Sequence, residues 1–532
     1  MKATYIDYNE TNSFSSTLLS YLSCDEKLKP YIADWPTVEN FNTLIAKKQV
    51  KSNRQTLVST LKKQYSDSGY QNNESQLVHN NIASLSSENT YTITTGHQLN
   101  IFTGPLYFIY KIVTAINLAA ELKAAHPNKH FVPVYWMATE DHDFEEINHV
   151  KVHGKKLTWN EDAKGATGRL DPISIRDTLR AYKNTLGLSE NSKTLSAILE
   201  EAYLNHTTLA DATRYLVHYL FSDYGLVILD ADDRDLKREF ADIIKQDILE
   251  QKSFAAISGT SKSLKESGFE TQVHSREINF FYLTDKLRER IVLEGNHWKV
   301  LNSDIRFNKY ELIAEIENYP ERFSPNVVMR PLYQEVILPN LAYIGGGAEI
   351  VYWLQLKQNF EQYKVDFPLL VLRNSALVAA ANLSDKLCRL KISIKDIFKE
   401  ANLIKKEWVT THSHHRLNLA DEMQDLSSIF EKLKLRAYKI DPTLSPSTEA
   451  VRVRLQKALS NLERKLIKAE KKNHEEVLSQ IDSLRNKYFP GNGLQERTEN
   501  FGIFYNQHGR MFIDELVHHF KPLDFKFTIL ES

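Results

Sequence analysis

The sequence has few cysteines and almost no net charge. Its 532 residues include only Cys24 and Cys388, too few for a disulfide framework or a cysteine-based structural zinc site. Lys and Arg total 67 and Asp and Glu total 68, so the formal net charge is −1. No overall field therefore steers the chain toward DNA or an anionic membrane. Such a thiol-poor chain suits a reducing compartment.

Export and membrane signals are also missing from the sequence. The first residues, Met-Lys-Ala-Thr-Tyr-Ile-Asp-Tyr, lack the basic start and apolar run of a signal peptide. No stretch approaches the roughly 18 uninterrupted apolar residues that a spanning helix needs. We therefore expect a cytoplasmic protein that does not bind a membrane.

The composition is that of a globular protein with more than one structural unit. Apolar residues make up 42% and charged residues 25% of the chain, which excludes a disordered or collagen-like protein. Single hydrophobic cores stop growing near roughly 250–300 residues. A chain of 532 residues is therefore expected to form two or more units.

A strand, a helix and a second strand follow one another in the first half of the chain. Tyr91–Thr95 is a β-rich run that meets Gly96, and a helical pattern extends from Pro105 to about Ala125. Phe131–Met137 is then an apolar, buried-type strand. This order and spacing predict a βαβ unit.

Further strands and helices alternate after this unit. Gly225–Asp230 is a strongly apolar strand that ends in acidic residues, and a helical pattern over Arg234–Gln251 follows it. The remaining strand candidates are Ile278–Thr284, Arg290–Leu293, Asn326–Arg330, Glu335–Leu338 and Leu369–Leu372. The alternation predicts an α/β core with a mainly parallel sheet.

The region from about Ser375 to Tyr488 has the pattern of long paired helices. Apolar residues recur at steps of four and three from Leu383 to Trp408, and again from Leu419 to Ile440. A third helix is expected to start with Ser445 as its N-cap and Pro446 at its first position. We interpret the region as an antiparallel coiled-coil arm that supports a homodimer. A compact helical bundle is the alternative.

The expected organisation has four parts. Residues 1–90 are a helical N-terminal region of the core, and residues 91–374 are the α/β core with an insertion at about 151–215. Residues 375–488 form the coiled-coil arm, and residues 489–532 are a C-terminal segment that packs back on the core.

The arm contains a basic stretch. Between Glu431 and Lys472 there are 12 Lys and Arg against 5 Asp and Glu. A solvated helix face explains this best. A face that binds a nucleotide or RNA is the sharper alternative.

The first candidate site joins the strand at 91–95 to the helix at 105–125. Gly96 permits a tight turn and a close approach of the backbone to a ligand. The helix N-terminus that follows offers free N–H groups for phosphate or carboxylate, and His97 and Gln98 could add donors. A plain turn with one packed histidine explains the segment about as well.

The second candidate site directly follows the apolar strand at 131–137. Glu140, Asp141, His142, Asp143 and Glu145 are dense titratable groups at the carboxyl end of a strand, where α/β proteins bind ligands. They could hold an ammonium group or move a proton. A metal site is a less favoured alternative, because the chain lacks the H-E-x-x-H motif. A charged, capped helix start would need no function.

The third candidate site is the run from Asn326 to Glu349. Three glycines, Gly345–Gly347, lie between an apolar run and an amphipathic helix, and Arg330 could supply a guanidinium fork for phosphate or carboxylate. A flexible loop with a structural arginine is an equal alternative. Two smaller clusters, Gln272–Asn279 and Tyr488–Arg497, are more often structural.

Taken as a set, the motifs resemble one family. They are Thr95-Gly-x-Gln98, Phe102-Thr-Gly-Pro-Leu-Tyr107 with Lys111, Glu140-Asp-His-Asp-Phe-Glu145, Val273-His-x-Arg276, Arg330-Pro-Leu-x-Gln334, Gly345-Gly-x-x-Glu349, Tyr352-Trp353 and Phe489-Pro-Gly-x-x-Leu-Gln-Glu-Arg497. The chain is thereby similar to the bacillithiol-biosynthesis cysteine ligase family. His97 stands where that pattern is expected to have a second glutamine.

The resemblance implies both a fold and a reaction. The implied core is Rossmann-like and of nucleotidyltransferase type, related to class I aminoacyl-tRNA synthetases, with inserted connecting regions and a long α-helical antiparallel coiled-coil arm that mediates dimerisation. The implied reaction adds cysteine to glucosaminyl-malate as an amide of the sugar amine. It would use ATP to activate the carboxylate, and no nucleic acid is expected to bind. The sequence leaves any metal requirement open.

The motifs and the resemblance together give the expected site. The expected catalytic residues are His97, Asp141, His142, Asp143 and Arg330. The expected substrate- or nucleotide-binding residues are Thr95, Gly96, Gln98, Gly104, Lys111, Glu140, His274, Arg276, Gln334, Gly345, Gly346, Gly347, Glu349, Tyr352, Trp353, Gln495 and Arg497. No residue is assigned to a metal. The rival functions are a metal-dependent hydrolase built on Glu140–His153 and a non-catalytic RNA-binding or scaffold protein that uses the basic arm.

Overall fold

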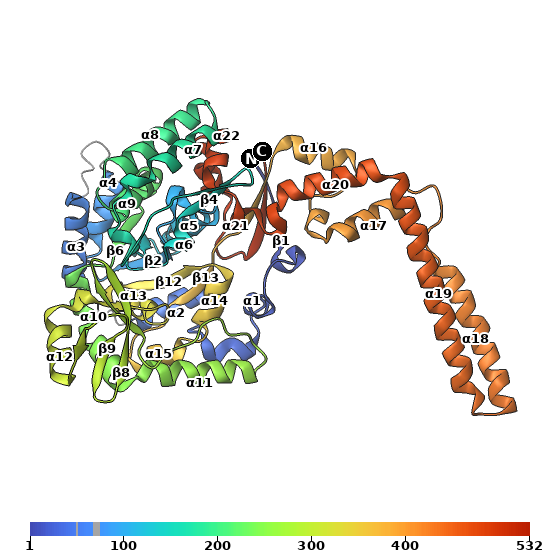
Figure 1. The fold of residues 1–532 in the computed structure, drawn as a ribbon, viewed down its shortest axis with the longest axis horizontal. Coiled ribbons are helices and arrows are strands. Elements are labelled where there is room, and N and C mark those ends of the chain that lie inside the picture. The colour runs from blue at the N-terminus through green and yellow to red at the C-terminus, as the bar shows by residue number, and fades with distance from the viewer. Residues whose placement is uncertain (49–51, 68–74) are drawn as a thin grey trace. The chain divides into compact units, whose positions relative to one another are not determined.

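The chain divides into two compact units (Figure 1). The structure is a computed structural model that describes residues 1–48, 52–67 and 75–532. The larger unit, here the core unit, comprises Met1–Asn9, Ser13–Leu377 and Gly493–Leu530. The smaller, here the helical unit, comprises Glu10–Asn12, Val378–Asn492 and Glu531–Ser532. The core unit is therefore built from segments that lie on both sides of the helical unit in sequence.

A five-stranded parallel sheet lies at the centre of the core unit. Its order is β13-β12-β2-β3-β6, and its strands are β2 (Thr90–His97), β3 (His130–Met137), β6 (Val227–Asp230), β12 (Asn340–Gly345) and β13 (Leu369–Leu372). From β2 the chain adds β3 and β6 on one side and β12 and β13 on the other. The sheet thus has a topological switch point between β2 and β12, where doubly wound α/β folds bind ligands. The parallel α/β core is confirmed.

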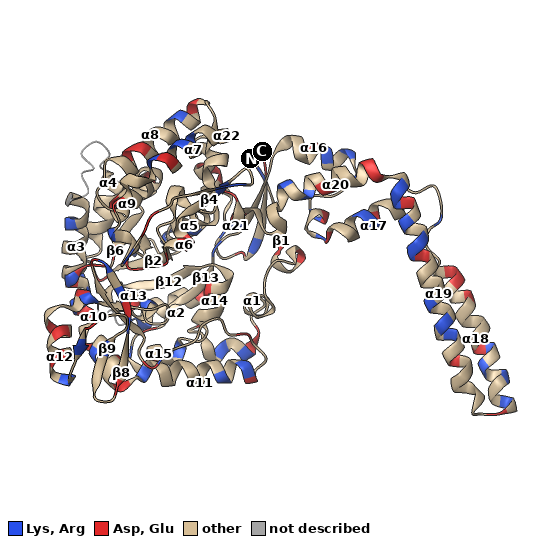
Figure 2. Cartoon of the chain, in the orientation of Figure 1, with Lys and Arg blue, Asp and Glu red and all other residues tan. Residues whose placement is uncertain are grey.

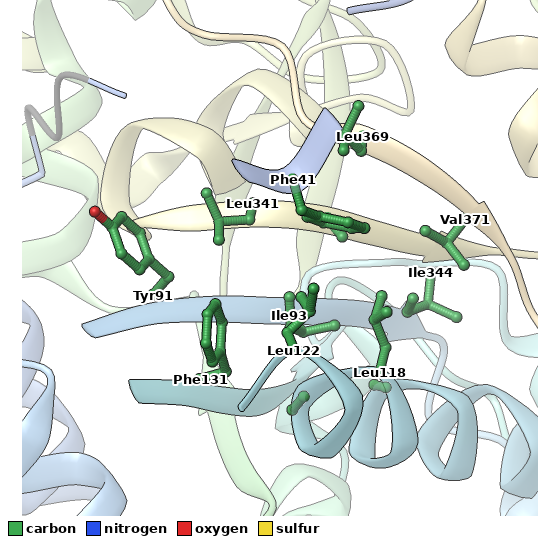
Figure 3. Packing of buried hydrophobic residues seen from close by; sticks show 13 residues of the cluster. Phe41, Tyr91, Ile93, Leu118, Leu122, Phe131, Leu341, Ile344, Leu369 and Val371 are labelled. Atoms are coloured by element: carbon green, nitrogen blue, oxygen red, sulfur yellow. The ribbon is translucent and has the colours of Figure 1, made fainter. Parts of the chain in front are cut away.

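Helix α5 (Tyr107–Ala125) links β2 to β3 and covers one face of the sheet (Figure 3). Leu118 and Leu122 of α5 pack against Ile93 and Phe131. Phe41, from α2 (Val38–Lys47), packs in the same cluster. The predicted βαβ unit is confirmed, since three consecutive elements bury a continuous apolar surface in the expected order.

Strand β2 is rich in threonine and is nevertheless buried. Thr92 and Thr94 donate hydrogen bonds to the side-chain oxygen of Asn340 at 3.1 and 2.9 Å, and Thr95 donates to the carbonyl of Ile344 at 3.0 Å. β-Branched residues suit a strand, and these partners satisfy their hydroxyl groups. These side chains therefore tie the strand that leads to Gly96 and His97 to its neighbour β12.

An antiparallel sheet and a β-hairpin also belong to the core unit. An antiparallel sheet of order β10-β9-β8-β7-β11 is formed by β7 (Phe280–Thr284), β8 (Leu287–Glu294), β9 (His297–Val300), β10 (Arg306–Phe307) and β11 (Phe323–Pro325). A hairpin is formed by β4 (His149–Val152) and β5 (Lys155–Thr158). The strands predicted at Ile278–Thr284 and Arg290–Leu293 are confirmed as β7 and β8, with shifted ends.

Two predicted strands are wrong. Residues 326–329 form no strand, and Glu335–Leu338 falls largely within helix α13 (Arg330–Ile337). Pro331 occupies the first turn of that helix, where its missing N–H is not needed. A short apolar run does not distinguish a buried strand from a buried helix, so the pattern here was ambiguous. The strand of this region is β12, which follows the helix.

The other helices and strands of the core unit surround these sheets. They are β1 (Lys2–Asp7), α1 (Ser16–Leu22), α3 (Arg54–Asp67), α4 (Gln76–Ser84), α6 (Phe144–Ile147), α7 (Arg176–Leu186), α8 (Glu190–Leu204), α9 (Leu209–Phe221), α10 (Arg234–Glu250), α11 (Lys252–Glu266), α12 (Lys309–Asn318), α14 (Gly347–Trp353), α15 (Lys357–Gln362), α21 (Gln495–Thr498), α22 (Phe501–His508), α23 (Met511–His519) and β15 (Lys526–Glu531). Strand β14 (Ala376–Ala379) runs across the boundary between the units. The strand β1 had not been expected in the helical N-terminal region.

The helical unit contains the long paired helices that the heptads predicted. Helices α18 (Ala420–Ile440) and α19 (Leu444–Asn473) are joined by three residues and pack side by side (Figure 1). The unit also contains α16 (Ala381–Arg389), α17 (Ala401–His412) and α20 (Glu475–Tyr488). Lys and Arg recur along α18 and α19 with Asp and Glu among them (Figure 2). Within the described residues, no helix combines the length and apolarity needed to cross a bilayer.

Two details of the predicted helices are wrong. The uninterrupted seam from Leu383 to Trp408 is divided between α16 and α17, because Lys391 adopts a positive φ of 55° between them. Helix α19 begins at Leu444 with Thr443 as its N-cap, so Ser445 and Pro446 both lie inside its first turn. A proline is tolerated anywhere in that turn, where backbone N–H groups have no helical partner.

Candidate functional site

A cavity of about 1040 Å³ opens at the carboxyl ends of the central strands of the core unit. Gly96 and His97 reach it from the end of β2, Glu140 and Asp141 from the loop after β3, and Gly346 from the loop after β12. The antiparallel sheet contributes further side chains from β7 and β8. The cavity therefore lies at the topological switch point of the sheet, as expected for a ligand site.

Most of the predicted site residues line this cavity. Those that do are Gly96, His97, Gln98, Lys111, Glu140, Asp141, His142, His274, Arg276, Arg330, Gly346, Gly347, Glu349, Tyr352 and Arg497. The structure brings together segments from β2, β3, β12 and the C-terminal part of the chain.

The other predicted residues do not line the cavity. They are Thr95, Gly104, Asp143, Gln334, Gly345, Trp353 and Gln495. Asp143 caps α6 by accepting a hydrogen bond from the Glu146 N–H at 3.3 Å. Gly104 has a φ of +60°, and a Cβ there would lie 2.5 Å from that of Asn100, so its role is conformational.

A buried ion pair occupies the switch point itself. The Lys111 ammonium, from the second turn of α5, lies 2.6 Å from the Glu349 carboxylate and donates to the Gly96 carbonyl at 2.8 Å. Tyr343 and the Gly346 N–H each donate to Glu349 at 2.7 Å. Burial raises the pKa of Glu349, but Lys111 and these hydrogen bonds outweigh it and hold that pKa at about 2. Glu349 is therefore ionised and Lys111 is fixed.

Two arginines extend this cationic wall. The Arg330 guanidinium lies over the rings of Trp136 and Tyr343, at 5.7 and 5.4 Å from their centroids, and donates to Gln334 at 3.0 Å. Its Nη2 is buried and donates no hydrogen bond within the described part of the chain. Arg373, just after β13, lies over the Tyr107 ring at 5.1 Å. A buried donor without a partner is expensive, so an anionic ligand would stabilise this wall.

Arg373 is held by a residue from the far end of the sequence. Its Nη2 lies 2.7 Å from the carboxylate of Glu496, which also accepts a hydrogen bond from the Ala376 N–H at 2.9 Å. The side chains of Arg373 and Glu496 are 4% and 0% exposed. The C-terminal segment thus completes the wall, both through this pair and through Arg497.

Carboxylates form another part of the wall. The amide of Gln98 donates to Asp141 at 2.7 Å and to Glu146 at 2.5 Å. His142 donates its backbone N–H to Asp141 at 2.8 Å. The cavity therefore presents cations and carboxylates in one space, and it can hold an anionic and an ammonium group together.

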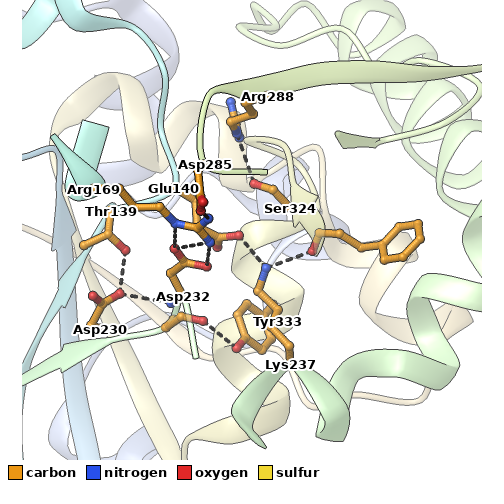
Figure 4. Close-up of polar contacts among 12 residues, drawn as sticks. Thr139, Glu140, Arg169, Asp230, Asp232, Lys237, Asp285, Arg288, Ser324 and Tyr333 are labelled. Carbon is orange, nitrogen blue, oxygen red and sulfur yellow. Dashed lines mark hydrogen bonds and ion pairs between the residues drawn. The ribbon is translucent and has the colours of Figure 1, made fainter. Parts of the chain in front are cut away.

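A buried ionic network lies behind Glu140 (Figure 4). The Lys237 ammonium, 0% exposed, pairs with Glu140 and donates to the Phe323 carbonyl at 2.8 Å. Arg169, from the segment between β5 and α7, forms two hydrogen bonds to Asp232, at 2.9 and 3.1 Å. The network joins the ends of β3 and β6 to α10, to β11 and to that segment. It fixes Glu140 in the cavity wall.

Asp230 is the titratable group of this network with the clearest expected pH effect. Thr139 donates to it at 2.5 Å and the Asp232 N–H at 3.0 Å, and burial together with the Asp232 charge raises the pKa of Asp230 to about 6. An unfolded aspartate has a pKa of roughly 3.9, so the folded state binds this proton more tightly. Ionisation of Asp230 in the folded state therefore lowers the free energy of unfolding. This destabilisation is fully present above about pH 6 and absent below about pH 4.

Replacing Asp230 with asparagine should therefore stabilise the protein at about pH 7.5. The expected gain in the free energy of unfolding is on the order of 2 kcal/mol, and it should shrink to near zero at about pH 4. Urea unfolding of wild type and variant across that range measures it. Asp285→Asn, at a side chain that is 97% exposed, is the matched control. Parallel pH profiles of wild type and Asp230→Asn would contradict the expectation.

The structure adds cavity residues that the expected site did not include. Among them are Tyr107, Glu146, Arg288, Arg290, Tyr343 and Arg373. Arg288 and Arg290 alternate along β8, so the period of two was their one sequence signal. Arg373 directly follows an apolar strand, and the strand-end rule would have found it.

Comparison with family models matches nearly the whole chain. Residues 1–374 match the model described as bacillithiol biosynthesis BshC, N-terminal Rossmann-like domain, and residues 376–532 match bacillithiol biosynthesis BshC, C-terminal coiled-coil domain.

Curated relatives match over similar lengths. A protein of Flavobacterium johnsoniae named as a candidate cysteine ligase, BshC, is 45% identical and covers 100% of both chains. Relatives of the same name from Christiangramia forsetii and Salinibacter ruber are 41% and 30% identical, covering 100% and 92% of this chain and 99% and 91% of their own. A solved structure from Campylobacter jejuni described as a candidate arginyl-tRNA synthetase covers 80% of this chain and 99% of its own. Its 10% identity and TM-score of 0.20 are too low to support an argument.

Proposed function

The chain belongs to the bacillithiol biosynthesis BshC family, and we propose that it is a ligase that joins the carboxyl group of cysteine to the amine of glucosaminyl-malate. The proposal is supported by the name that the relatives carry. The single structural observation that favours it is the cavity in which Lys111, Arg330 and Arg373 share one space with Glu140 and Asp141. The metal-hydrolase and RNA-binding alternatives are not favoured, because the family is a ligase family.

Amide formation places defined demands on this site. A carboxylate must be activated before an amine can attack it, and ATP is the proposed source of that activation. The residues present fit its phosphates, since Lys111, Arg330 and Arg373 are fixed cations and the buried Nη2 of Arg330 lacks a partner within the described residues. Carboxylates at Asp141 and Glu146 suit the ammonium groups of cysteine and of the amino sugar. Gln98 fixes Asp141 by a hydrogen bond, and Glu140 is itself fixed by its ion pair with Lys237.

A ligation assay tests the proposal. Purified full-length protein, ATP, cysteine and glucosaminyl-malate are incubated together, and the amide is detected by mass spectrometry, with each substrate omitted in turn. Arg330→Met should lower the yield of product, because the wall loses a fixed charge. If the complete mixture yields no amide and cells that lack the protein still make the thiol product, the proposal is wrong.

We also propose that the protein works in the reducing cytoplasm. The substrate carries a free thiol, and both cysteines of the chain, Cys24 and Cys388, are unpaired and exposed. Neither lines the cavity. The thiol handled by the protein would then be that of its substrate.

The helical unit supports a further proposal, that two chains associate through it. Large apolar side chains are exposed on α18 and α19, including Leu435 at 63%, Tyr438 at 58%, Ile440 at 81% and Val453 at 51%. A coiled-coil pair with such a face is suited to a second copy of itself.

Replacing Leu435 and Tyr438 together with glutamate should turn a dimer into a monomer. The charges would be buried without partners in the proposed interface. Sedimentation velocity of the purified chain measures the mass directly. Lys439→Glu is a matched control on the same helix. A wild-type protein that sediments as a single chain at micromolar concentration would contradict this proposal.

A further inference from the structure

Two of the histidines that line the cavity have ring nitrogens with fixed and different partners. His97 follows β2 and lies near the Lys111–Glu349 pair, whereas His142 lies in the loop after β3 near Arg288. In a neutral imidazole one nitrogen donates and the other accepts, and the partner of one nitrogen decides the role of the other. Here Nδ1 of His97 faces a hydrogen-bond acceptor, whereas Nδ1 of His142 faces a hydrogen-bond donor.

His97 is fixed as an acceptor. Its Nδ1 lies 3.0 Å from the carbonyl oxygen of Gln98. A carbonyl only accepts, so Nδ1 carries the proton and Nε2 retains its lone pair. The ring packs against Tyr107 and Phe108, with centroids 5.4 and 5.3 Å away. Burial and the Lys111 ammonium lower the pKa of His97 to about 4, so the ring is neutral at neutral pH.

His142 is fixed as a donor. Its Nδ1 lies 2.6 Å from Nη1 of Arg288. A guanidinium only donates, so Nδ1 accepts and the proton lies on Nε2. Burial and the Arg288 charge lower the pKa of His142, although Asp141, Asp143 and Glu289 oppose this.

Arg288 is itself held rigidly. It donates to the Ser324 hydroxyl at 3.1 Å and to the Pro325 carbonyl at 3.3 Å. Its guanidinium lies over the Phe281 ring at 4.1 Å. These contacts all come from β7 and β11 of the antiparallel sheet, so the sheet fixes the direction in which Arg288 meets His142.

We propose that His97 and His142 are held as opposite tautomers, so that one binds a hydrogen-bond donor of the ligand and the other binds a hydrogen-bond acceptor. His97 accepts a hydrogen bond from a hydroxyl or an uncharged amine. His142 donates one to an anionic oxygen. Arg288 is the positioning residue that sets the tautomer of His142.

The surrounding charges define these ligand groups further. Lys111 and Arg373 together outweigh the Glu349 carboxylate near His97 and disfavour an ammonium there, so the group that donates to His97 is uncharged. Arg288, at 2.6 Å from Nδ1 of His142, favours a carboxylate or phosphate oxygen, and the Asp141 carboxylate, which opposes it, lies farther away, at 3.8 Å from the same nitrogen. If the chain acts on glucosaminyl-malate, a hydroxyl or the deprotonated amine of the sugar meets His97. This part rests on the proposed function, whereas the tautomers do not.

Nuclear magnetic resonance tests the tautomers without any need for activity. The full chain is labelled with ¹⁵N-histidine, and long-range proton–nitrogen correlations distinguish protonated from unprotonated ring nitrogens. His97→Gln and His142→Asn assign the two signals. At about pH 7.5 the unprotonated nitrogen should be Nε2 in His97 and Nδ1 in His142. The reverse pattern, or averaging between tautomers at either residue, would overturn the proposal.

Variants of Arg288 test its positioning role. Arg288→Gln should release His142 into a mixture of tautomers and leave His97 unchanged, and Arg288→Lys should restore the Nε2–H form, since an ammonium also only donates. If Arg288→Gln leaves the His142 signal unaltered, the positioning role is wrong.

Titration with simple anions identifies the ligand group at His142. Malate and inorganic phosphate are added separately, and the His142 Nε2–H signal should shift with at least one of them. Binding of that anion should weaken about tenfold in His142→Phe and remain within about threefold in Lys123→Met, whose side chain lies outside the cavity. Failure of both anions to shift the signal at about 10 mM would exclude an anionic partner.

The acceptor role of His97 predicts a contrast between two variants in the ligation assay. A glutamine can still accept through its side-chain oxygen, so His97→Gln should keep the KM for glucosaminyl-malate within about threefold. His97→Phe should raise it at least tenfold. Equal effects of the two variants would contradict the acceptor role, while an absence of ligation by the wild type would contradict the proposed function alone.

Discussion

Replacing Glu496 with alanine should lower the free energy of unfolding of the core unit by about 3–5 kcal/mol. The change removes the partner of Arg373, whose side chain is 4% exposed and lies 2.7 Å from the carboxylate. Breaking a buried ion pair leaves an uncompensated charge in a low-dielectric environment, which is more harmful than losing the pair as a whole. The remaining partners of Arg373, Ser375 and the Asn374 carbonyl, are uncharged.

Urea unfolding followed by tryptophan fluorescence measures this effect. Trp408 is the one tryptophan of the helical unit, so a Trp408→Phe background reports on the core unit through the other tryptophans. The double variant Arg373→Met with Glu496→Leu should lie within about 1 kcal/mol of the background, because it buries no charge. A double variant as unstable as Glu496→Ala would show that the charge is not the cause.

Replacing Lys111 with methionine should lower the kcat/KM of ligation by about 10²–10³-fold. The ammonium is fixed by Glu349 and by the Gly96 carbonyl at the switch point of the sheet. A preorganised charge that faces developing negative charge in an enclosed site typically contributes an effect of this size. Methionine retains the length of the side chain. Glu349 loses its cation, but it is 25% exposed and keeps its hydrogen bonds from Tyr343 and the Gly346 N–H, so the fold should be retained.

The control for this prediction lies on the same helix. Lys123→Met removes an exposed ammonium near the C-terminal end of α5, outside the cavity, and should leave kcat/KM unchanged. Lys111→Arg should retain part of the activity, since it keeps the charge. If Lys111→Met folds with an unchanged melting temperature and ligates within threefold of wild type, the ammonium has no role in the reaction.

The parts of the site that local pattern predicts are those at strand ends. Gly96, His97 and Asp141 each follow a strand whose apolar, β-branched run is plain in the sequence, and the strand-end rule then places them together. The same rule applied to Leu369–Leu372 would have reached Arg373.

Other parts of the site have no local signal. Arg288 meets His142 across 146 residues of sequence, and Glu496 meets Arg373 across 123. Such contacts are decided by how the antiparallel sheet and the C-terminal segment pack, and periodicity within one element does not report on that packing. The tautomers of the two histidines depend on these contacts, so they too required the structure.

The helical patterns predicted which segments are helical better than they predicted where each helix ends. The seam of α18 is a continuous helix, as its heptads indicated. The same spacing between Leu383 and Trp408 continues through Lys391, whose positive φ ends the helical path. Apolar spacing indicates which side chains are buried. A turn can keep the same spacing although the helix has ended.

The discontinuous core unit has a consequence during synthesis of the chain. The ribosome makes Arg373 and the five central strands well before Glu496, because the residues between Leu377 and Gly493 are almost all in the helical unit. At roughly 5–20 residues per second, that interval lasts on the order of ten seconds. Arg373 lacks its carboxylate for all of that time. A nascent or prematurely terminated chain lacks Glu496, so the cavity wall that contains Arg373 is incomplete. The site can form only after translation has passed the C-terminal segment.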